Sequence, residues 1–295
     1  MITILGATGH TGSAIADRLL SLEEFVRVVG RDEGKLAAYK ERGAEVMAGD
    51  VADPTFLTVA LRGADAAWLL IPPAYNVPDY LATSDNVAES IATAVSDSGI
   101  THVVLLSSIG GEKDSGTGPV VGLHRTEERL RGITSVNSLF LRAGYFYENA
   151  FGSLGMIKGM GINGGAIAPD VPVTMVASRD IGEIAARALR ARDFTGVEVR
   201  AAIGPRDYTM RDVTQIIGRA IGRPDLQYQQ FPPESFIQGL QQAGFSANTA
   251  RLFAEMGQAL NEGHMKSPDP RTEANTGLTT FEEFVPALAA AYNAM

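Results

Sequence analysis

The sequence contains no cysteine among its 295 residues. It therefore cannot form a disulfide, a thiolate nucleophile or a cysteine-ligated metal site. Histidine is also scarce, and its four positions are too scattered to give the paired spacing of a metal-binding motif. We expect no metal site. The histidines are His10, His102, His124 and His264.

Long apolar runs are missing as well. No stretch approaches the roughly 18 apolar residues that a membrane-spanning helix needs, and no basic segment leads into an apolar one at the N-terminus. The formal net charge of −9 argues against direct binding of nucleic acid or of an anionic membrane. We therefore expect a soluble, cytoplasmic globular protein. Its sequence is compatible with a homo-oligomer but does not indicate one.

Short apolar runs alternate with segments of helical periodicity along the first half of the chain. The runs are mostly apolar on both faces, which is typical of parallel strands covered by helices. Strand then helix, repeated, predicts an α/β fold with a Rossmann-like, doubly wound parallel sheet. The expected strands are 2–5, 25–29, 44–48, 66–71, 102–106 and 136–141, and the expected helices are 10–21, 33–42, 55–62, 79–98 and 120–131.

The regular alternation ends near residue 143. Glycines crowd the following segment, which favours a mobile loop at 152–170 over regular structure. We therefore divide the chain into a sheet domain and a smaller, mainly helical lobe that packs over the carboxyl edge of the sheet. The sheet domain comprises 1–143 with 172–205, and the lobe comprises 144–171 and 206–295.

Regular elements resume after the glycine-rich segment. A helix is expected at 176–191, with Asp180 as its cap, and a strand at 198–203 is expected to join the sheet. Further helices are expected near 210–221, 233–243, 247–261 and 281–293.

Three glycines, Gly6, Gly9 and Gly12, follow the first expected strand in the motif GATGHTG. Bulk at the first two would hinder a tight turn and the approach of a phosphate to the backbone, and the third lets the helix sit close to the strand. The helix that begins here offers unpaired N–H groups and a positive dipole end to a pyrophosphate. The motif therefore predicts dinucleotide binding, and a glycine-rich turn without a ligand is the alternative.

The end of the second expected strand reads VVGRDEGK and indicates which dinucleotide is bound. An acidic residue here holds the ribose 2′-hydroxyl of NAD, whereas an arginine accommodates the 2′-phosphate of NADP. Arg31 occupies this place, with Lys35 one helical turn later. The pattern favours NADP(H) as the cofactor, with NAD(H) as a second choice. The alternative is that both cations are solvated surface charges.

Ordered motifs along nearly the whole chain resemble the NmrA-like atypical short-chain dehydrogenase/reductase family. The likeness is strongest to its NAD(P)H:quinone oxidoreductase type 2 branch and to the ergot-alkaloid-type reductases. The motifs are GATGHTG at 6–12, the arginine after the second strand, GDVADP at 49–54, HVVLLSS at 102–108, HRTEERL at 124–130 and LRAGYFYENA at 141–150.

The resemblance implies positions for the cofactor and the substrate. The glycine loop would line the pyrophosphate, with Arg31 and Lys35 at the 2′-phosphate. The remaining positions are Thr8, His10 and Thr11 at the pyrophosphate, Asp50 and Val51 at the adenine, Leu70, Ile71 and Pro72 at the nicotinamide-side ribose, Ser107 at the cofactor, near the expected serine position of short-chain dehydrogenases, and Tyr145, Tyr147 and Asn149 at the nicotinamide and substrate cleft.

The sequence departs from ordinary short-chain dehydrogenases in their catalytic pair. These enzymes use a tyrosine and a lysine four residues apart after the fifth strand, and Val120 and His124 stand at those places. The usual acid for carbonyl reduction is therefore missing. His124, whose imidazole type titrates near neutrality, and Tyr147 are the catalytic candidates. The alternatives are a structural histidine bonded to the neighbouring loop and a tyrosine that packs between lobes. Thr126 and Glu127 are expected on the helix surface or against the cofactor loop.

A reaction that needs no strongly positioned acid fits this sequence. Hydride addition to a quinone gives a stabilised anion that solvent can protonate, and a protonated imine needs mainly hydride and orientation. We therefore expect an NADPH-dependent reductase of a quinone, imine, azo compound or similar small apolar or aromatic acceptor, without flavin. The alternative is an NmrA-type redox sensor that binds NAD(P), partners a transcription regulator and has little or no catalytic activity.

Overall fold

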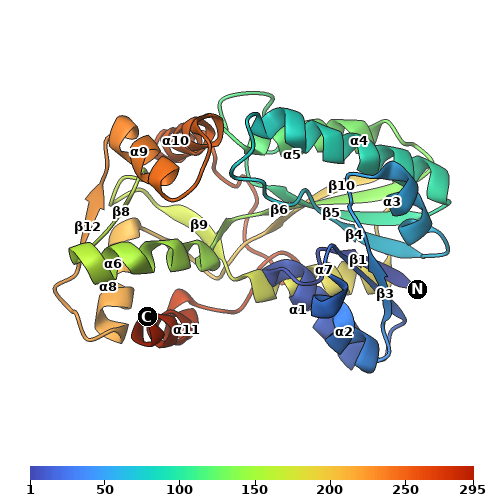
Figure 1. The fold of residues 1–295 in the computed structure, drawn as a ribbon, viewed down its shortest axis with the longest axis horizontal. Coiled ribbons are helices and arrows are strands. Elements are labelled where there is room, and N and C mark those ends of the chain that lie inside the picture. The colour runs from blue at the N-terminus through green and yellow to red at the C-terminus, as the bar shows by residue number, and fades with distance from the viewer.

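A seven-stranded sheet organises the first part of the chain in the computed structural model, which describes residues 1–295 (Figure 1). Its strand order is β10-β6-β5-β4-β1-β2-β3, and every pair of neighbours is parallel. This confirms the predicted Rossmann-like fold. The strands are β1 (Ile2–Leu5), β2 (Val26–Gly30), β3 (Glu45–Ala48), β4 (Ala66–Leu69), β5 (His102–Ser108), β6 (Asn137–Ala143) and β10 (Val197–Ala202).

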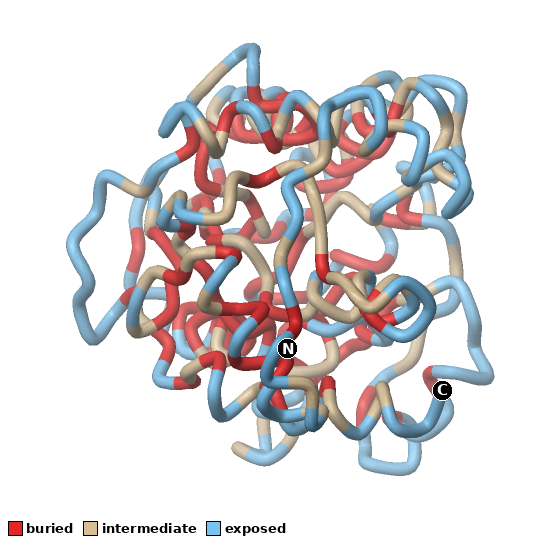
Figure 2. The backbone as a smooth tube through the Cα atoms, turned by 90° about the vertical axis from the view of Figure 1, so that its left-hand side faces the viewer, coloured by how far each residue is buried: buried red, intermediate tan, exposed pale blue.

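Helices cover both faces of this sheet (Figure 1). The first layer packs with one set of strand side chains into one apolar core, and the second layer forms another core on the opposite face. Figure 2 shows the buried backbone gathered in the interior, with the exposed segments around it. The first layer comprises α1 (His10–Ser21), α2 (Glu33–Glu41) and α7 (Ser178–Ala191), and the second comprises α3 (Pro54–Leu61), α4 (Tyr80–Ser98) and α5 (Val120–Arg131).

We use the term second lobe for residues 144–171 and 206–295. Two small sheets, in the orders β11-β9-β7 and β12-β8, lie among its helices and its own apolar core. The elements of the lobe are β7 (Tyr145–Phe146), the 3-10 helix η1 (Tyr147–Ser153), α6 (Leu154–Met160), β8 (Ile162–Gly165), β11 (Asp207–Tyr208), α8 (Met210–Ala220), β12 (Gln227–Gln230), α9 (Pro233–Gln242), α10 (Ala247–Asn261) and α11 (Phe281–Ala294). The middle strand of the first small sheet, β9 (Val173–Val176), comes from the segment 172–205.

The glycine-rich segment is not the loop that the sequence led us to expect at 152–170. It forms α6 and β8, and β8 pairs with β12. Gly161 ends α6 in the left-handed region at a φ of +76°. A Cβ at Gly164 would lie 2.5 Å from the ring of Phe231. The glycines therefore serve a helix end and a close approach between strand and ring rather than mobility.

The start of α7 also differs from the expectation. Asp180 does not cap it, because its carboxylate accepts hydrogen bonds from the backbone N–H (2.9 Å) and the hydroxyl (2.8 Å) of Thr279. Glu148 of η1 caps the start of α7 instead, because its carboxylate accepts hydrogen bonds from the backbone N–H and the hydroxyl of Ser178. The strand expected at 198–203 is confirmed as β10, which lies beside β6.

Two hydrogen bonds join the second lobe to the loop that follows β4. The N–H of Ser246 donates to the carbonyl of Tyr75 (2.9 Å), and the N–H of Tyr80 donates to the side chain of Asn248 (2.9 Å). The lobe is thereby held beside the carboxyl edge of the sheet. Among its helices, none combines the length and the apolar character that crossing a membrane requires.

Candidate active site

The glycine motif forms a tight turn between β1 and α1. Gly6 follows β1 and has a φ of +64°, a backbone conformation that residues other than glycine rarely adopt. A Cβ at Gly12 would lie 2.3 Å from the carbonyl oxygen of Gly6. Gly6 is therefore required by its backbone conformation, and Gly12 is required by the close contact between the turn and the first turn of α1.

The N-terminus of α1 is open to a ligand. Gly9 stands at its cap position and offers no side-chain oxygen to the helix. Thr8, Gly9 and His10 are exposed, while Thr11 is buried. The first N–H groups of a helix have no partner within it, and the helix dipole is positive there. This cradle therefore fits the pyrophosphate of a dinucleotide.

Two free cations lie at the next turn, between β2 and α2. Arg31 and Lys35 are both exposed, and neither forms an ion pair with a carboxylate. The carboxylate of the neighbouring Asp32 caps the start of α2, where it accepts a hydrogen bond from the backbone N–H of Lys35 at 3.3 Å. Asp32 and Glu33 balance the formal charge of the turn, but the guanidinium of Arg31 and the ammonium group of Lys35 have no ion-pair partner and can bind a phosphate on the ribose.

The other expected cofactor residues follow β3 and β4. Asp50 is exposed and its carboxylate accepts from the N–H of Ala52. Val51 is buried, and its carbonyl accepts from the hydroxyl of Ser90 on α4. Leu70 lies against the glycine turn, since a Cβ at Gly6 would come within 2.9 Å of it. The half-buried Ile71 and Pro72 continue along the same edge.

A cavity of about 300 Å³ lies between the carboxyl edge of the sheet and the second lobe. Ile71 and Ser107 line it from the ends of β4 and β5, and Tyr145 lines it just beyond β6. Met256 and Met265 form part of the wall from the second lobe. None of its 23 lining residues is an acid, a base or a histidine. The cavity therefore suits an uncharged, apolar molecule.

Aromatic rings from both lobes close one side of this cavity. Tyr75, on the loop after β4, stacks on Phe245 with a centroid separation of 4.6 Å and an interplanar angle of 17°. Phe253 of α10 meets Tyr75 edge to face at 5.8 Å. Tyr75 and Phe253 both line the cavity. The aromatic wall is therefore built only when the two lobes come together.

The structure separates the predicted substrate and catalytic residues. Tyr145 and Asn149 line the cavity. Tyr147 does not: its ring is completely buried in the second-lobe core and its hydroxyl donates to the carbonyl of Thr279 at 3.1 Å. His124 does not line the cavity either, and its Nδ1 lies 3.0 Å from the carbonyl oxygen of Gly111. The geometry thus gives Tyr147 a packing role and ties His124 to the loop.

Glu127 was expected on the helix surface or the cofactor loop, but only 1% of its surface is exposed. Its carboxylate accepts from the Ser107 hydroxyl at 2.6 Å and from the Arg142 guanidinium at 3.0 and 2.7 Å. Thr126 beside it is also buried and bonds back to Gly122. The helix turns these residues towards β5 and β6, where the arginine compensates the buried charge.

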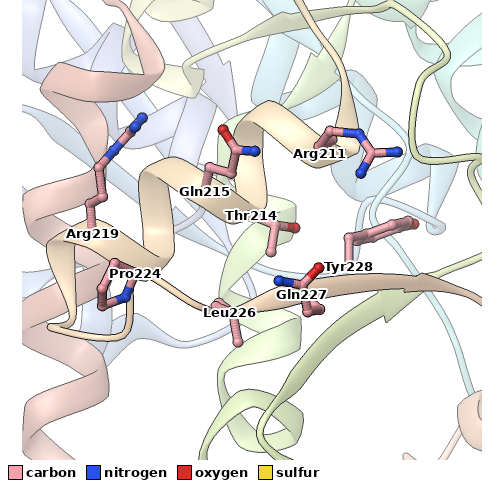
Figure 3. Close-up of a pocket in the computed structure, with 8 residues that line it drawn as sticks. All are labelled: Arg211, Thr214, Gln215, Arg219, Pro224, Leu226, Gln227 and Tyr228. Carbon is pink, nitrogen blue, oxygen red and sulfur yellow. The ribbon is translucent and has the colours of Figure 1, made fainter.

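The second lobe carries a separate groove of about 310 Å³ between α8 and β12 (Figure 3). Figure 3 shows Arg211, Gln215 and Arg219 spaced along the same helix. The guanidinium of Arg211 is already paired with Asp170 at 2.7 and 2.9 Å. The groove is mostly polar and lies away from the glycine turn, so the apolar cavity is the better candidate for an active site.

Known proteins share the length and the fold of this chain. It is 29% identical over 277 residues to (4-alkanoyl-5-oxo-2,5-dihydrofuran-3-yl)methyl phosphate reductase of Streptomyces griseus subsp. griseus, covering 94% of this chain and 93% of that one. It is 26% identical over 298 residues to NAD(P)H azoreductase of Xenophilus azovorans, covering all of both.

Solved structures resemble it over the same extent. The Citrobacter sp. triphenylmethane reductase complexed with NADP(H) has a TM-score of 0.82 and 21% identity over 98% of this chain and 100% of its own. The Escherichia coli quinone oxidoreductase QOR2 complexed with NADPH has a TM-score of 0.80 and 22% identity over 98% and 99%. The NmrA-like family profile matches residues 1–285. This chain belongs to the NmrA-like family.

Proposed function

We propose that the protein is an NADPH-dependent reductase that transfers a hydride to a small, uncharged, apolar or aromatic acceptor. Quinones, imines and azo compounds are the classes that fit. One observation carries the proposal: an uncharged cavity opens at the same sheet edge as a glycine turn suited to a pyrophosphate. Ligands of doubly wound sheets bind outside the carboxyl ends of the strands, so cofactor and acceptor would meet there.

The chain's own residues favour NADP(H) over NAD(H). The turn after β1 would hold the pyrophosphate, and Arg31 and Lys35, which have no acidic partner, would hold the 2′-phosphate. The relative from Xenophilus is named for NAD(P)H, and the two solved neighbours are complexes with NADPH and NADP(H). When bound, the reduced nicotinamide would supply the hydride.

The absence of charged side chains from the cavity limits the class of acceptor that can bind. A phosphate or sulfonate buried there would lose its hydration without gaining a cationic partner, which is costly. We therefore infer that this chain does not share the phosphate-ester substrate of the Streptomyces relative. The tyrosine and phenylalanine faces favour a flat, conjugated molecule, because ring faces stack on such surfaces.

The residues of the chain would act mainly by orienting the acceptor. Methionines and aromatic rings of the second lobe line the cavity opposite the sheet edge, and they would hold the acceptor against the bound cofactor. Val120 and His124 stand in place of the tyrosine and lysine of ordinary short-chain dehydrogenases, so no such acid–base pair assists the reaction. The acceptor must accordingly be one that hydride addition turns into a stabilised product.

The first experiment is a calorimetric titration of NADPH and of NADH into the purified protein, followed by absorbance at the nicotinamide band with a panel of acceptors. We expect NADPH to bind more tightly, and we expect oxidation by a neutral quinone but not by its sulfonated analogue. Tight binding without turnover of any acceptor would instead favour the redox-sensor alternative. Binding of neither cofactor would refute both.

A further inference from the structure

The three serines that line the cavity donate their hydroxyl protons elsewhere. Ser107 donates to the buried carboxylate of Glu127 at 2.6 Å. Ser84 donates to the carbonyl of Tyr80 at 2.9 Å, and Ser108 donates to the carbonyl of Ile109 at 3.0 Å. These hydroxyls can therefore accept hydrogen bonds from a ligand, but their protons are already engaged.

Among the remaining hydroxyls, Tyr145 lies nearest to the reacting edge of the sheet by its place in the chain. It follows the end of β6 by two residues, and β7 pairs it with Met175 of β9. The backbone before it is tightly held, because a Cβ at Gly144 would lie 2.6 Å from the carbonyl oxygen of Thr174. Thr174 also lines the cavity but turns its methyl carbon towards Gly144. Tyr75 and Tyr80, which also line the cavity, follow the end of β4 by six and eleven residues, on the loop and at the start of α4.

The surroundings of Tyr145 keep its phenol protonated. Burial raises the pKa of the Tyr145 phenol, and the nearby side chain of Asn149, which also lines the cavity, offsets this only in part. An amide N–H of Asn149 that donates to the phenol oxygen when a ligand binds would leave the phenol proton free for that ligand.

We propose that the Tyr145 hydroxyl, supported by Asn149, donates a hydrogen bond to the acceptor atom that becomes negatively charged on hydride addition. This rests on the proposed reductase function and assigns the donor that the missing tyrosine–lysine pair does not provide. A quinone takes up a hydride, which is one hydrogen nucleus and two electrons, while NADPH is oxidised to NADP⁺. The resulting hydroquinone monoanion accepts the bond from Tyr145, and solvent supplies the proton that completes the hydroquinone.

The test compares two bicyclic acceptors of similar size. Naphthoquinone becomes an anion on hydride addition. The preformed cation N-methyl-dihydroisoquinolinium, whose delocalised charge the ring faces of Tyr75 and Phe253 can stabilise, becomes a neutral amine and needs no donor. We expect Tyr145→Phe to lower kcat for naphthoquinone about 10- to 100-fold. This is less than the roughly 100- to 1000-fold that loss of one oxyanion donor costs in other enzymes, because resonance already stabilises the hydroquinone anion. Turnover of the cation should change by less than about twofold. Tyr292→Phe, which removes a phenol from α11 outside the cavity, is the matched control.

Equal losses with both acceptors would overturn the proposal, because they would show that Tyr145 only shapes the cavity. Unchanged turnover of naphthoquinone would overturn it as well. A binding measurement gives an independent readout: bound nitrophenol should ionise at a higher pH in Tyr145→Phe than in wild type, and identical ionisation would again exclude the donor. Wild-type protein that binds NADPH and reduces neither acceptor would refute the proposed function itself, before any variant is made.

Discussion

The carboxylate of Glu127 accepts a 2.6 Å hydrogen bond from the hydroxyl of Ser107, which links a serine on the cavity wall to a charge buried inside the fold. The same carboxylate binds the guanidinium of Arg142 through two N–H groups. Gly111 closes over the pair, since a Cβ there would lie 2.7 Å from the carboxylate and 2.8 Å from the serine oxygen. The end of β5, α5 and β6 are thus locked together beside the candidate site.

Replacing Glu127 by glutamine should therefore destabilise the protein strongly. Removal of the Glu127 charge leaves the guanidinium of Arg142 paired only with the more exposed Glu112, at 3.0 Å. We expect the free energy of unfolding to fall by about 3 kcal/mol, the lower end of the cost of breaking a buried ion pair. Urea unfolding measures this loss. Glu128→Gln is the matched control on the same helix, because Glu128 is 57% exposed where it pairs with Arg131; it should cost less than about 1 kcal/mol. Similar losses for both variants would contradict the assigned role of Glu127.

The choice of cofactor should depend on Arg31. Arg31→Gln removes a charge expected to hold the 2′-phosphate, so the dissociation constant of NADPH should rise about 10-fold or more, while that of NADH should stay within about twofold. Isothermal titration calorimetry with both cofactors decides this. Lys40→Gln, which removes an exposed charge from the far end of α2, should leave both affinities unchanged. Equal weakening of NADPH and NADH by Arg31→Gln would remove the 2′-phosphate assignment.

The start of α11 gives the fold a pH dependence. Burial tends to raise the pKa of the Glu282 carboxyl, but hydrogen bonds from its own backbone N–H, from Tyr208 and from Arg206 outweigh it, and the folded-state pKa lies below the ordinary 4.5. The native state therefore binds a proton less readily than the unfolded chain. The resulting stability is present above pH 4.5 and is lost as the pH falls through the folded-state pKa.

Glu282→Gln should accordingly lower stability at neutral pH, by less than about 1 kcal/mol because the pair is half exposed. The difference from wild type should shrink in acid, and thermal unfolding at a series of pH values tracks it. Glu234→Gln is the control, since Glu234 occupies the first turn of α9 and forms no ion pair. A gap between Glu282→Gln and wild type that persists in acid would rule out the carboxylate as its source.

The sheet could be predicted from local sequence because each parallel strand carries its own apolar pattern and its own following helix. The glycine turn was equally readable: the constraint on Gly6 and Gly12 arises within seven residues of chain. Tyr147 was not readable in this way. Its place is decided by contact with Phe281 at 5.1 Å, and no local pattern links residues so far apart. The alternation in YFYEN also ends where the 3-10 helix η1 begins, which turns Tyr147 away from the cavity that Tyr145 lines.

Charge patterning misled the interpretation of α5 for a related reason. The segment HRTEERLR is rich in charge, and such a helix usually faces solvent. Glu127 is nevertheless buried, because its carboxylate forms an ion pair with Arg142 of β6. The aromatic wall was missed as well. Tyr75 lies at least 170 residues before Phe245 and Phe253 in the chain. Only the packing of the two lobes brings these rings into contact.

That aromatic wall should determine how well the acceptor binds. Tyr75→Ala removes a stacked ring and an edge-to-face contact. KM for a bicyclic quinone should therefore rise about 3- to 10-fold. The value of kcat should change less, because the ring contacts the acceptor equally in the bound state and in the transition state. Tyr75→Phe keeps the ring and should behave like wild type, since the Tyr75 hydroxyl forms no hydrogen bond within the protein. Steady-state kinetics of both variants separates the two effects. If Tyr75→Phe were as impaired as Tyr75→Ala, the hydroxyl rather than the ring would be the recognition element, and the wall would have to be reinterpreted.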